Sequence, residues 1–114
     1  MQCIARFEWD KEKRLANLEK RGLDFEDAWK VFESDYLEIK DAPEDYGETR
    51  FEVYGIANFE VVIVTHTPRP EVIRIISMRK ADRDETNFYY EQISYQNQIA
   101  DRLEPHFSDA GRGY

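Results

Sequence analysis

The chain has 114 residues, of which 41% are hydrophobic and 14% aromatic, and it carries a formal net charge of −8. This length and apolar content predict one folded domain and exclude a disordered segment. The negative charge argues against nonspecific electrostatic binding of nucleic acid over a large surface, because phosphate binding depends on clustered Lys and Arg. Any chemistry on RNA is therefore expected to be local.

Membrane insertion, structural zinc and other cofactors are not expected. The longest apolar run, Val61–Val64, is far shorter than the roughly 18 residues of a membrane helix. The N-terminus also lacks the pattern of a signal peptide, which predicts a cytoplasmic protein. Cys3 is accompanied only by His66 and His106, so the paired Cys and His spacings of a zinc site are missing.

The N-terminal part of the chain is expected to form two helices. After a short extended segment over Cys3–Trp9, Asp10 is a suitable N-cap for a helix over Lys11–Arg21. Gly22 would end that helix, and Asp24 would cap a second one. Large apolar side chains on these helices are expected to pack against a sheet: Leu15, Leu18, Phe25, Trp29 and Phe32.

Four mostly antiparallel strands are expected to follow. Their ranges are Tyr36–Lys40, Arg50–Ala57, Phe59–Thr67 and Val72–Met78. The last element is a helix from Ala81 to about Leu103, which Asp82 and Glu85 would open as a capping box. Because helices and strands are segregated, the predicted fold class is α+β. Residues 1–91 would form the domain, and residues 92–114 would extend the closing helix and form a tail.

A series of ordered landmarks resembles the BrnT family of bacterial toxin–antitoxin systems. The landmarks include Phe7-Glu8-Trp9-Asp10, Lys20-Arg21-Gly22, Phe25-Glu26-Asp27-Ala28, Arg74-Ile75-Ile76-Ser77 and Arg79-Lys80-Ala81. They extend over about Phe7 to Glu91, and their order is more specific than any single motif. Two positions depart from the family pattern: Arg21 stands where the family usually has His, and residues 82–86, commonly very basic there, are mostly acidic here.

The resemblance implies a RelE-like fold and cleavage of RNA without a metal ion. It also implies neutralisation by a cognate antitoxin, a BrnA-like protein of the ribbon-helix-helix type. An exposed sheet edge or apolar surface would be covered by that antitoxin, and the chain alone would instead pair with itself as a homodimer.

Metal-free RNA cleavage needs a base for the 2′-hydroxyl, cations for the transition state and an acid for the leaving oxygen. The predicted site residues are Arg79, Lys80, Arg74, Arg50 and His66. Arg79 and Lys80 would contact phosphate, with Arg74 and Arg50 in support. His66 would transfer protons, since an imidazole titrates near neutral pH. Together these residues are expected to form a small positive island on a negative protein.

Each of these residues also has a structural interpretation. Arg79 could pair with one of the many acids, Arg50 with Glu48 or Glu52, and His66 could be a core residue. Strict alternation would place Arg74 and Arg79 on opposite faces of the strand unless the chain bends near Ser77 or Met78. Two functions therefore stay open: an RNA-cleaving toxin, or a non-catalytic interaction module derived from one.

Overall fold

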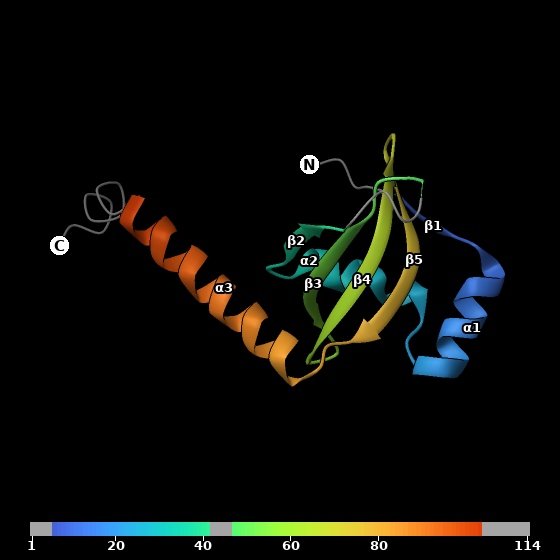
Figure 1. Cartoon of the computed structure of the whole chain (residues 1–114), viewed down its shortest axis with the longest axis horizontal. Helices are drawn as coiled ribbons and strands as arrows, with labels where there is room; N and C mark the ends of the chain where they lie inside the picture. Colours follow the sequence, from blue (N-terminus) through green and yellow to red (C-terminus); the bar gives the residue numbers. More distant parts are fainter. Residues whose placement is uncertain (1–5, 42–46, 104–114) are drawn as a thin grey trace.

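The computed structural model describes residues 6–41 and 47–103 (Figure 1). Its elements are β1 (Arg6–Trp9), α1 (Lys11–Arg21), the 3-10 helix η1 (Phe25–Asp27), α2 (Ala28–Glu33), β2 (Leu37–Lys40), β3 (Phe51–Ala57), β4 (Glu60–Arg69), β5 (Val72–Lys80) and α3 (Arg83–Leu103). Cys3, His106, most of the turn before Gly47 and the tail after Leu103 lie outside the described residues. The α+β class predicted from the sequence is confirmed.

One five-stranded sheet forms the centre of the molecule, in the order β1-β5-β4-β3-β2. The predicted number of four strands is wrong, because β1 joins the sheet parallel to β5 and places Phe7 beside Ile73. The other neighbouring strands are antiparallel, as expected, and β4 is the central strand. The β1 pairing joins residues that are far apart in the chain, so local patterning did not reveal it.

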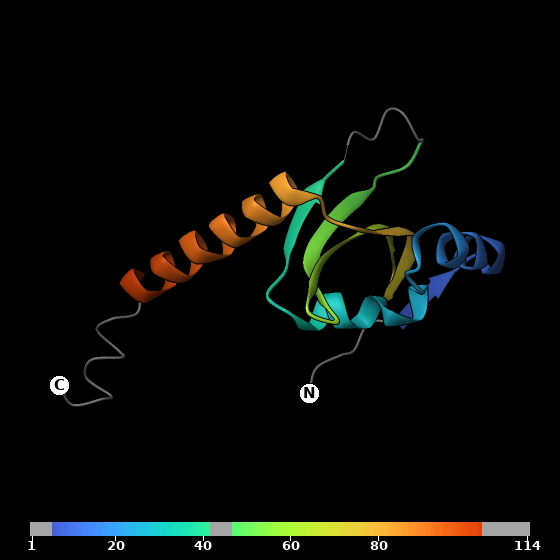
Figure 2. The same cartoon turned by 90° about the horizontal axis from the view of Figure 1, so that it is seen from below.

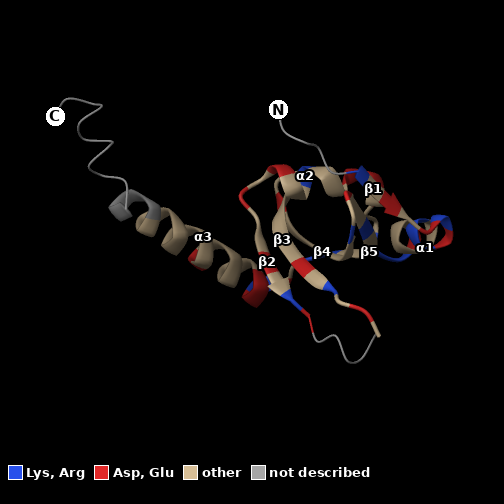
Figure 3. Ribbon diagram, turned by 90° about the horizontal axis from the view of Figure 1, so that it is seen from above, with Lys and Arg blue, Asp and Glu red and all other residues tan. Residues whose placement is uncertain are grey.

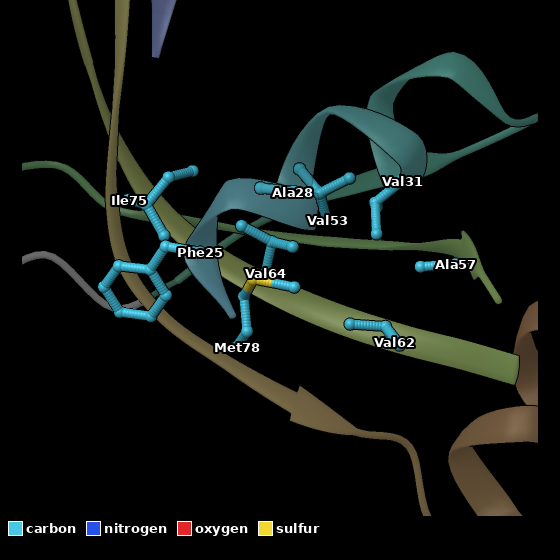
Figure 4. Packing of buried hydrophobic residues seen from close by; sticks show 9 residues of the cluster. All are labelled: Phe25, Ala28, Val31, Val53, Ala57, Val62, Val64, Ile75 and Met78. Carbon is cyan, nitrogen blue, oxygen red and sulfur yellow. The ribbon is translucent and has the colours of Figure 1, made fainter. Parts of the chain in front are cut away.

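The main core lies between the sheet and α2, which runs inside the curve of the strands (Figures 2 and 4). Gly55 on β3 permits this close approach, because a Cβ there would lie 2.7 Å from Val31 Cγ1 and 2.8 Å from the Val31 carbonyl oxygen. Ser34, at the end of α2, accepts a hydrogen bond from the Ile56 backbone N–H at 3.0 Å. The helix is therefore both packed and hydrogen-bonded to β3.

The side of the second helix that faces the core differs from the prediction. Phe25 is 1% exposed, as predicted, but Trp29 is 50% exposed. The buried positions are Phe25, Ala28 and Val31, a spacing of three that fits the 3-10 geometry of η1 at the start of the segment. The apolar stripe is therefore rotated away from Trp29. On α1, Leu15 and Leu18 are also exposed, so their predicted packing is wrong, whereas Phe32 packs partly buried against the core.

A buried polar side chain, Asn17, attaches α1 to the sheet. β1 ends at Trp9 opposite Ile75, so the second half of β5 has no strand on that side. Asn17 Oδ1 accepts a hydrogen bond from the Met78 N–H at 3.2 Å, and Asn17 Nδ2 donates to the Leu23 carbonyl at 3.0 Å. The side chain thus satisfies a backbone donor where the sheet ends.

The other side of the sheet is covered only in part, by the first half of α3. Tyr89 is buried against Leu37, Tyr54 and Ile63, and its hydroxyl donates to the Asp35 carbonyl. Beyond this contact α3 extends away from the sheet (Figure 1). Within the described ranges, none of the helices combines the length and apolar character of a membrane span.

Candidate functional site

The outer face of β4 and β5 carries two of the predicted arginines. Arg74 lies opposite Thr67 and Arg79 opposite Ile63, and these partners are four residues apart on β4, so they share a face. An irregularity in the pairing opposite Thr65/His66 makes this possible, because Ile76 is an extra residue in β5. The break in strict alternation that would bring both arginines to one face is therefore present, one position before Ser77. We call this surface, with Glu52, Thr65, Arg74, Ser77 and Arg79, the arginine face.

Arg79 is held by a carboxylate at the start of α3. Its Nη1 and Nη2 donate to Glu85 Oε1 and Oε2 at 2.8 and 2.9 Å. Glu85 also closes the predicted capping box with Asp82, which confirms that expectation. The hydrogen bonds from Arg79 lower the pKa of Glu85 below its ordinary value and raise that of Arg79. The Arg79 side chain nevertheless keeps 35% of its surface exposed.

A second group of charges lies at the other end of the arginine face. Arg74 Nη1 donates to Glu8 Oε2 on β1 at 2.9 Å, and Arg69 Nε lies 3.8 Å from the same oxygen. Arg69 also approaches Glu48 at 3.8 Å, and Arg50 Nε lies 3.5 Å from Glu48 Oε2. Three arginines and two glutamates thus connect β1, β4, β5 and the segment before β3. Of the two partners in the structural interpretation of Arg50, Glu48 or Glu52, the structure shows the pair with Glu48.

Between the two charge groups lie polar side chains that carry potential proton-transfer groups. Thr65 and Ser77 are opposite each other, and Glu52 is opposite Thr65 on β3. Burial raises the pKa of the Glu52 carboxyl above its usual value, and the negative charge of Asp41 adds to this effect. Burial also raises the pKa of the Tyr54 hydroxyl, two residues further along β3. Sequence patterning alone indicated Glu52 only as an ion-pair partner of Arg50, although strict alternation along β3 places it on the opposite side of the strand from Val53.

His66 lies on the opposite side of the sheet from the arginine face. Its register partners place it beside Phe51 and Ile75, and it is 3% exposed between the rings of Phe51 and Phe32. His66 Nε2 lies 3.4 Å from Glu38 Oε2. Burial lowers the pKa of the imidazole, and the Glu38 carboxylate only partly opposes this shift. The structural alternative, a core histidine, describes this environment.

The five predicted site residues do not form one island. Arg50, Arg74 and Arg79 are on or beside the arginine face, whereas Lys80 is opposite Val62, on the side of the sheet that packs against α2. Lys80 Nζ lies 3.2 Å from Glu60 Oε2 at the exposed strand end. Arg74 and Arg79 are separated by roughly 13 Å, from four strand residues at about 3.3 Å each. The expected cluster is therefore corrected to a row of arginines along the sheet, each ion-paired to a carboxylate.

In the described part of the chain, no three His, Cys, Asp or Glu side chains are grouped so that they could hold a metal ion. The groups available on the arginine face are guanidinium, hydroxyl and carboxyl groups.

These features define a class: a small α+β protein with one sheet face packed against α2 and an opposite face, partly covered by α3, that carries a row of arginines. Over residues 9–85, the sequence matches the family described as "Ribonuclease toxin, BrnT, of type II toxin-antitoxin system". This match covers more than half of the chain, so the protein belongs to the BrnT family. Membership places it among the ribonuclease toxins of type II systems and implies an antitoxin as its partner. Among curated proteins, no match was found.

Proposed function

We propose that the protein cleaves RNA on the arginine face without a metal ion. The observation that carries this proposal is the extra residue in β5, which aligns Arg74 and Arg79 on one face with two hydroxyl groups and Glu52. Guanidinium groups bind phosphate oxygens in a bidentate manner, and a row of them suits a chain of phosphates.

The cleavage step uses the 2′-hydroxyl of the RNA as nucleophile. Its oxygen bonds to the adjacent phosphorus as the bond to the 5′-oxygen of the next nucleotide breaks. The departing 5′-oxygen takes up a proton from water, which leaves a 2′,3′-cyclic phosphate and a 5′-hydroxyl end. Glu52 is the group on this face best suited to accept the proton of the 2′-hydroxyl, because burial raises its pKa above the usual carboxyl value and so makes it a stronger base. Arg79 stabilises the charge that develops on the phosphate oxygens.

The ion pair to Glu85 orients Arg79 without consuming it. Two N–H groups of the guanidinium are bound to Glu85, and an arginine has five. The remaining donors, on a side chain that is 35% exposed, are available to a phosphate oxygen. Arg74 is held in a similar way by Glu8. Neither arginine needs to be ordered by the substrate, which lowers the entropic cost of reaching the transition state.

The antitoxin is proposed to be a BrnA-like ribbon-helix-helix protein that acts in the cytoplasm, where the RNA substrates are. Its docking surface on this chain includes the aromatic side chains of α3 and of the β3–β4 turn, where Phe59 is 99% exposed and Tyr90 and Tyr95 are each more than half exposed. Charged residues are sparse along α3 after its first turn (Figure 3). A DNA-binding partner is basic, and the charge of −8 favours it over a second copy of this chain.

A non-catalytic interaction module is the second candidate, and one observation favours it. On the arginine face, Arg50, Arg74 and Arg79 all pair with carboxylates, so little net positive charge remains there for RNA. In this case the chain would bind its antitoxin and shape a repressor complex without attacking RNA.

Expression of the chain from an inducible promoter separates these functions. A ribonuclease toxin stops growth and degrades cellular RNA, and co-expression of the product of the neighbouring gene relieves both effects. An interaction module binds the same product, but its expression leaves growth and RNA intact. The double variant Tyr90→Ser/Tyr95→Ser should keep the toxicity and reduce relief by the partner, whereas unchanged relief would remove α3 from the docking surface.

A further inference from the structure

We infer that a hollow between α1 and β5 is a second phosphate-binding site, which anchors the RNA backbone beside the arginine face. The hollow has a volume of about 290 Å³. It is lined by Lys13, Ala16, Asn17, Lys20, Arg21, Ile76 and Ser77. The inference rests on the proposed action on RNA, since it assigns where the substrate is held.

The cations of this hollow differ from those of the sheet in having no recorded ion pair. Within the described ranges, Lys13, Lys20 and Arg21 have no carboxylate at ion-pair distance, whereas the neighbouring Arg14 pairs with Asp24 at 2.7 Å. Three uncompensated positive charges around one concave surface, on a protein of net charge −8, would repel one another without an anion. A phosphate group would relieve that repulsion.

The spacing of these residues directs them to the hollow. Lys13, Ala16 or Asn17, and Lys20 recur at intervals of three and four, so they follow one side of α1. Cations at the C-terminal end of a helix are common because they complement its dipole, which would explain Lys20 and Arg21 alone. Lys13 lies near the N-terminal end, where the dipole disfavours a cation. The helix dipole therefore does not account for the set.

Asn17 and Ser77 contribute polar groups to the lining of the hollow. Asn17 is buried and fixed by its hydrogen bond to the Met78 N–H, and Ala16 leaves space beside it. Ser77 contributes to the hollow and is also opposite Thr65 on the arginine face. A strand of RNA that contacts Arg74 or Arg79 could therefore continue past Ser77 to the three cations. Figure 3 shows Lys and Arg positions on α1, which lies beside β5 at the end of the molecule away from α3.

A labelled single-stranded DNA oligonucleotide of about 12 nucleotides is the direct probe, because it carries the phosphates and lacks the 2′-hydroxyl needed for cleavage. The test variant is Lys13→Gln/Lys20→Gln/Arg21→Gln. The matched control is Arg6→Gln/Lys40→Gln/Arg83→Gln, which removes three exposed cations from three separate elements. Gln has a helix propensity close to that of Lys and Arg, so α1 should keep its structure, as circular dichroism would verify.

The hollow variant should bind the oligonucleotide at least about tenfold more weakly at low salt, and its salt slope should fall by about 2, from about 0.7 per phosphate contact. The control should change affinity by less than about threefold. Equal losses in both variants would mean that only net charge matters, and unchanged binding by the hollow variant would exclude the site; either result overturns the inference. If the protein cleaves no RNA but the hollow variant loses DNA binding, the site stands and the proposed cleavage fails. If the hollow variant binds the oligonucleotide normally and the protein cleaves RNA, the proposed cleavage stands and the phosphate site in the hollow fails.

Discussion

Two basic regions of this protein differ in how their charges are balanced. On the arginine face, Arg74 and Arg79 are each hydrogen-bonded to a glutamate from another element. In the hollow beside α1, Lys13 and Lys20 have no such partner among the described residues. A paired arginine has a fixed position and little net field, whereas unpaired lysines attract phosphate without a fixed geometry. The contrast suggests a division between a surface that orients the reacting phosphate and one that holds the RNA.

The largest expected effect is a split between turnover and affinity. Arg79→Ala should lower kcat by roughly 100-fold or more, as does loss of one transition-state donor in other enzymes, and should leave KM nearly unchanged. The hollow variant Lys13→Gln/Lys20→Gln/Arg21→Gln should raise KM and retain most of kcat. Steady-state kinetics on one RNA substrate would measure both. If both variants lose kcat equally, the arginine face and the hollow do not have separate roles in turnover and in RNA binding.

The support beneath the hollow can be tested through stability. Asn17→Ala removes the acceptor of the Met78 N–H and should lower the free energy of unfolding by about 1–3 kcal/mol, the cost of an unsatisfied buried donor. Denaturant titration would measure the loss. Asn87→Ala, at an exposed position on α3, should change stability by less than about 0.5 kcal/mol. A similar small effect at Asn17 would show that the hydrogen bond does not hold α1.

Features of the fold that depend on neighbouring residues in the chain could be predicted from the sequence, whereas a contact between distant residues could not. The α1 helix, its end at Gly22 and the capping box at Asp82 and Glu85 depend on neighbours in the chain, and all were predicted. The pair between Glu8 and Arg74 joins positions 66 residues apart. It depends on the parallel pairing of β1, which no local pattern encodes.

The arrangement of the site was harder to predict than the fold because it depends on register. One extra residue at Ile76 decides which side chains of β5 share a face. His66 was assigned to the site from its residue type alone, because an imidazole suits proton transfer. Its position in β4 instead buries it against Phe51, on the other side of the sheet. The hollow was missed because Lys13 and Lys20 lie about 60 residues before Ser77 in the chain and are unremarkable on a helix alone.

A smaller effect concerns pH and the pairing on the arginine face. Glu85 has a lowered pKa in the folded protein, so its ion pair stabilises the fold above the ordinary value of 4.5 and this contribution is lost as the pH falls below it. Glu85→Gln keeps a capping-box residue but removes the charge. The variant should be less stable at neutral pH by on the order of 1 kcal/mol, with a smaller difference at acidic pH. Thermal unfolding of the variant and of the unchanged protein, each at neutral and at acidic pH, would measure this difference. A difference that stays the same at both pH values would refute the stabilising ion pair between Glu85 and Arg79.

The smallest expected effect is at Lys80. Its side chain pairs with Glu60 at an exposed strand end, on the side away from Arg79. Lys80→Ala should change the free energy of unfolding by less than about 0.5 kcal/mol and kcat by less than about threefold. A large loss of turnover with an intact fold would restore Lys80 to the site, as the sequence suggested.

The most direct test of metal-free cleavage on the arginine face uses the purified protein without its partner. A defined single-stranded RNA is incubated with it in excess chelator, beside the same RNA with 2′-O-methyl groups throughout. We predict that the unmodified RNA is cut to products with 2′,3′-cyclic phosphate ends and that the methylated RNA stays intact. Failure to cut unless a divalent ion is restored, or equal cutting of the methylated RNA, would contradict it.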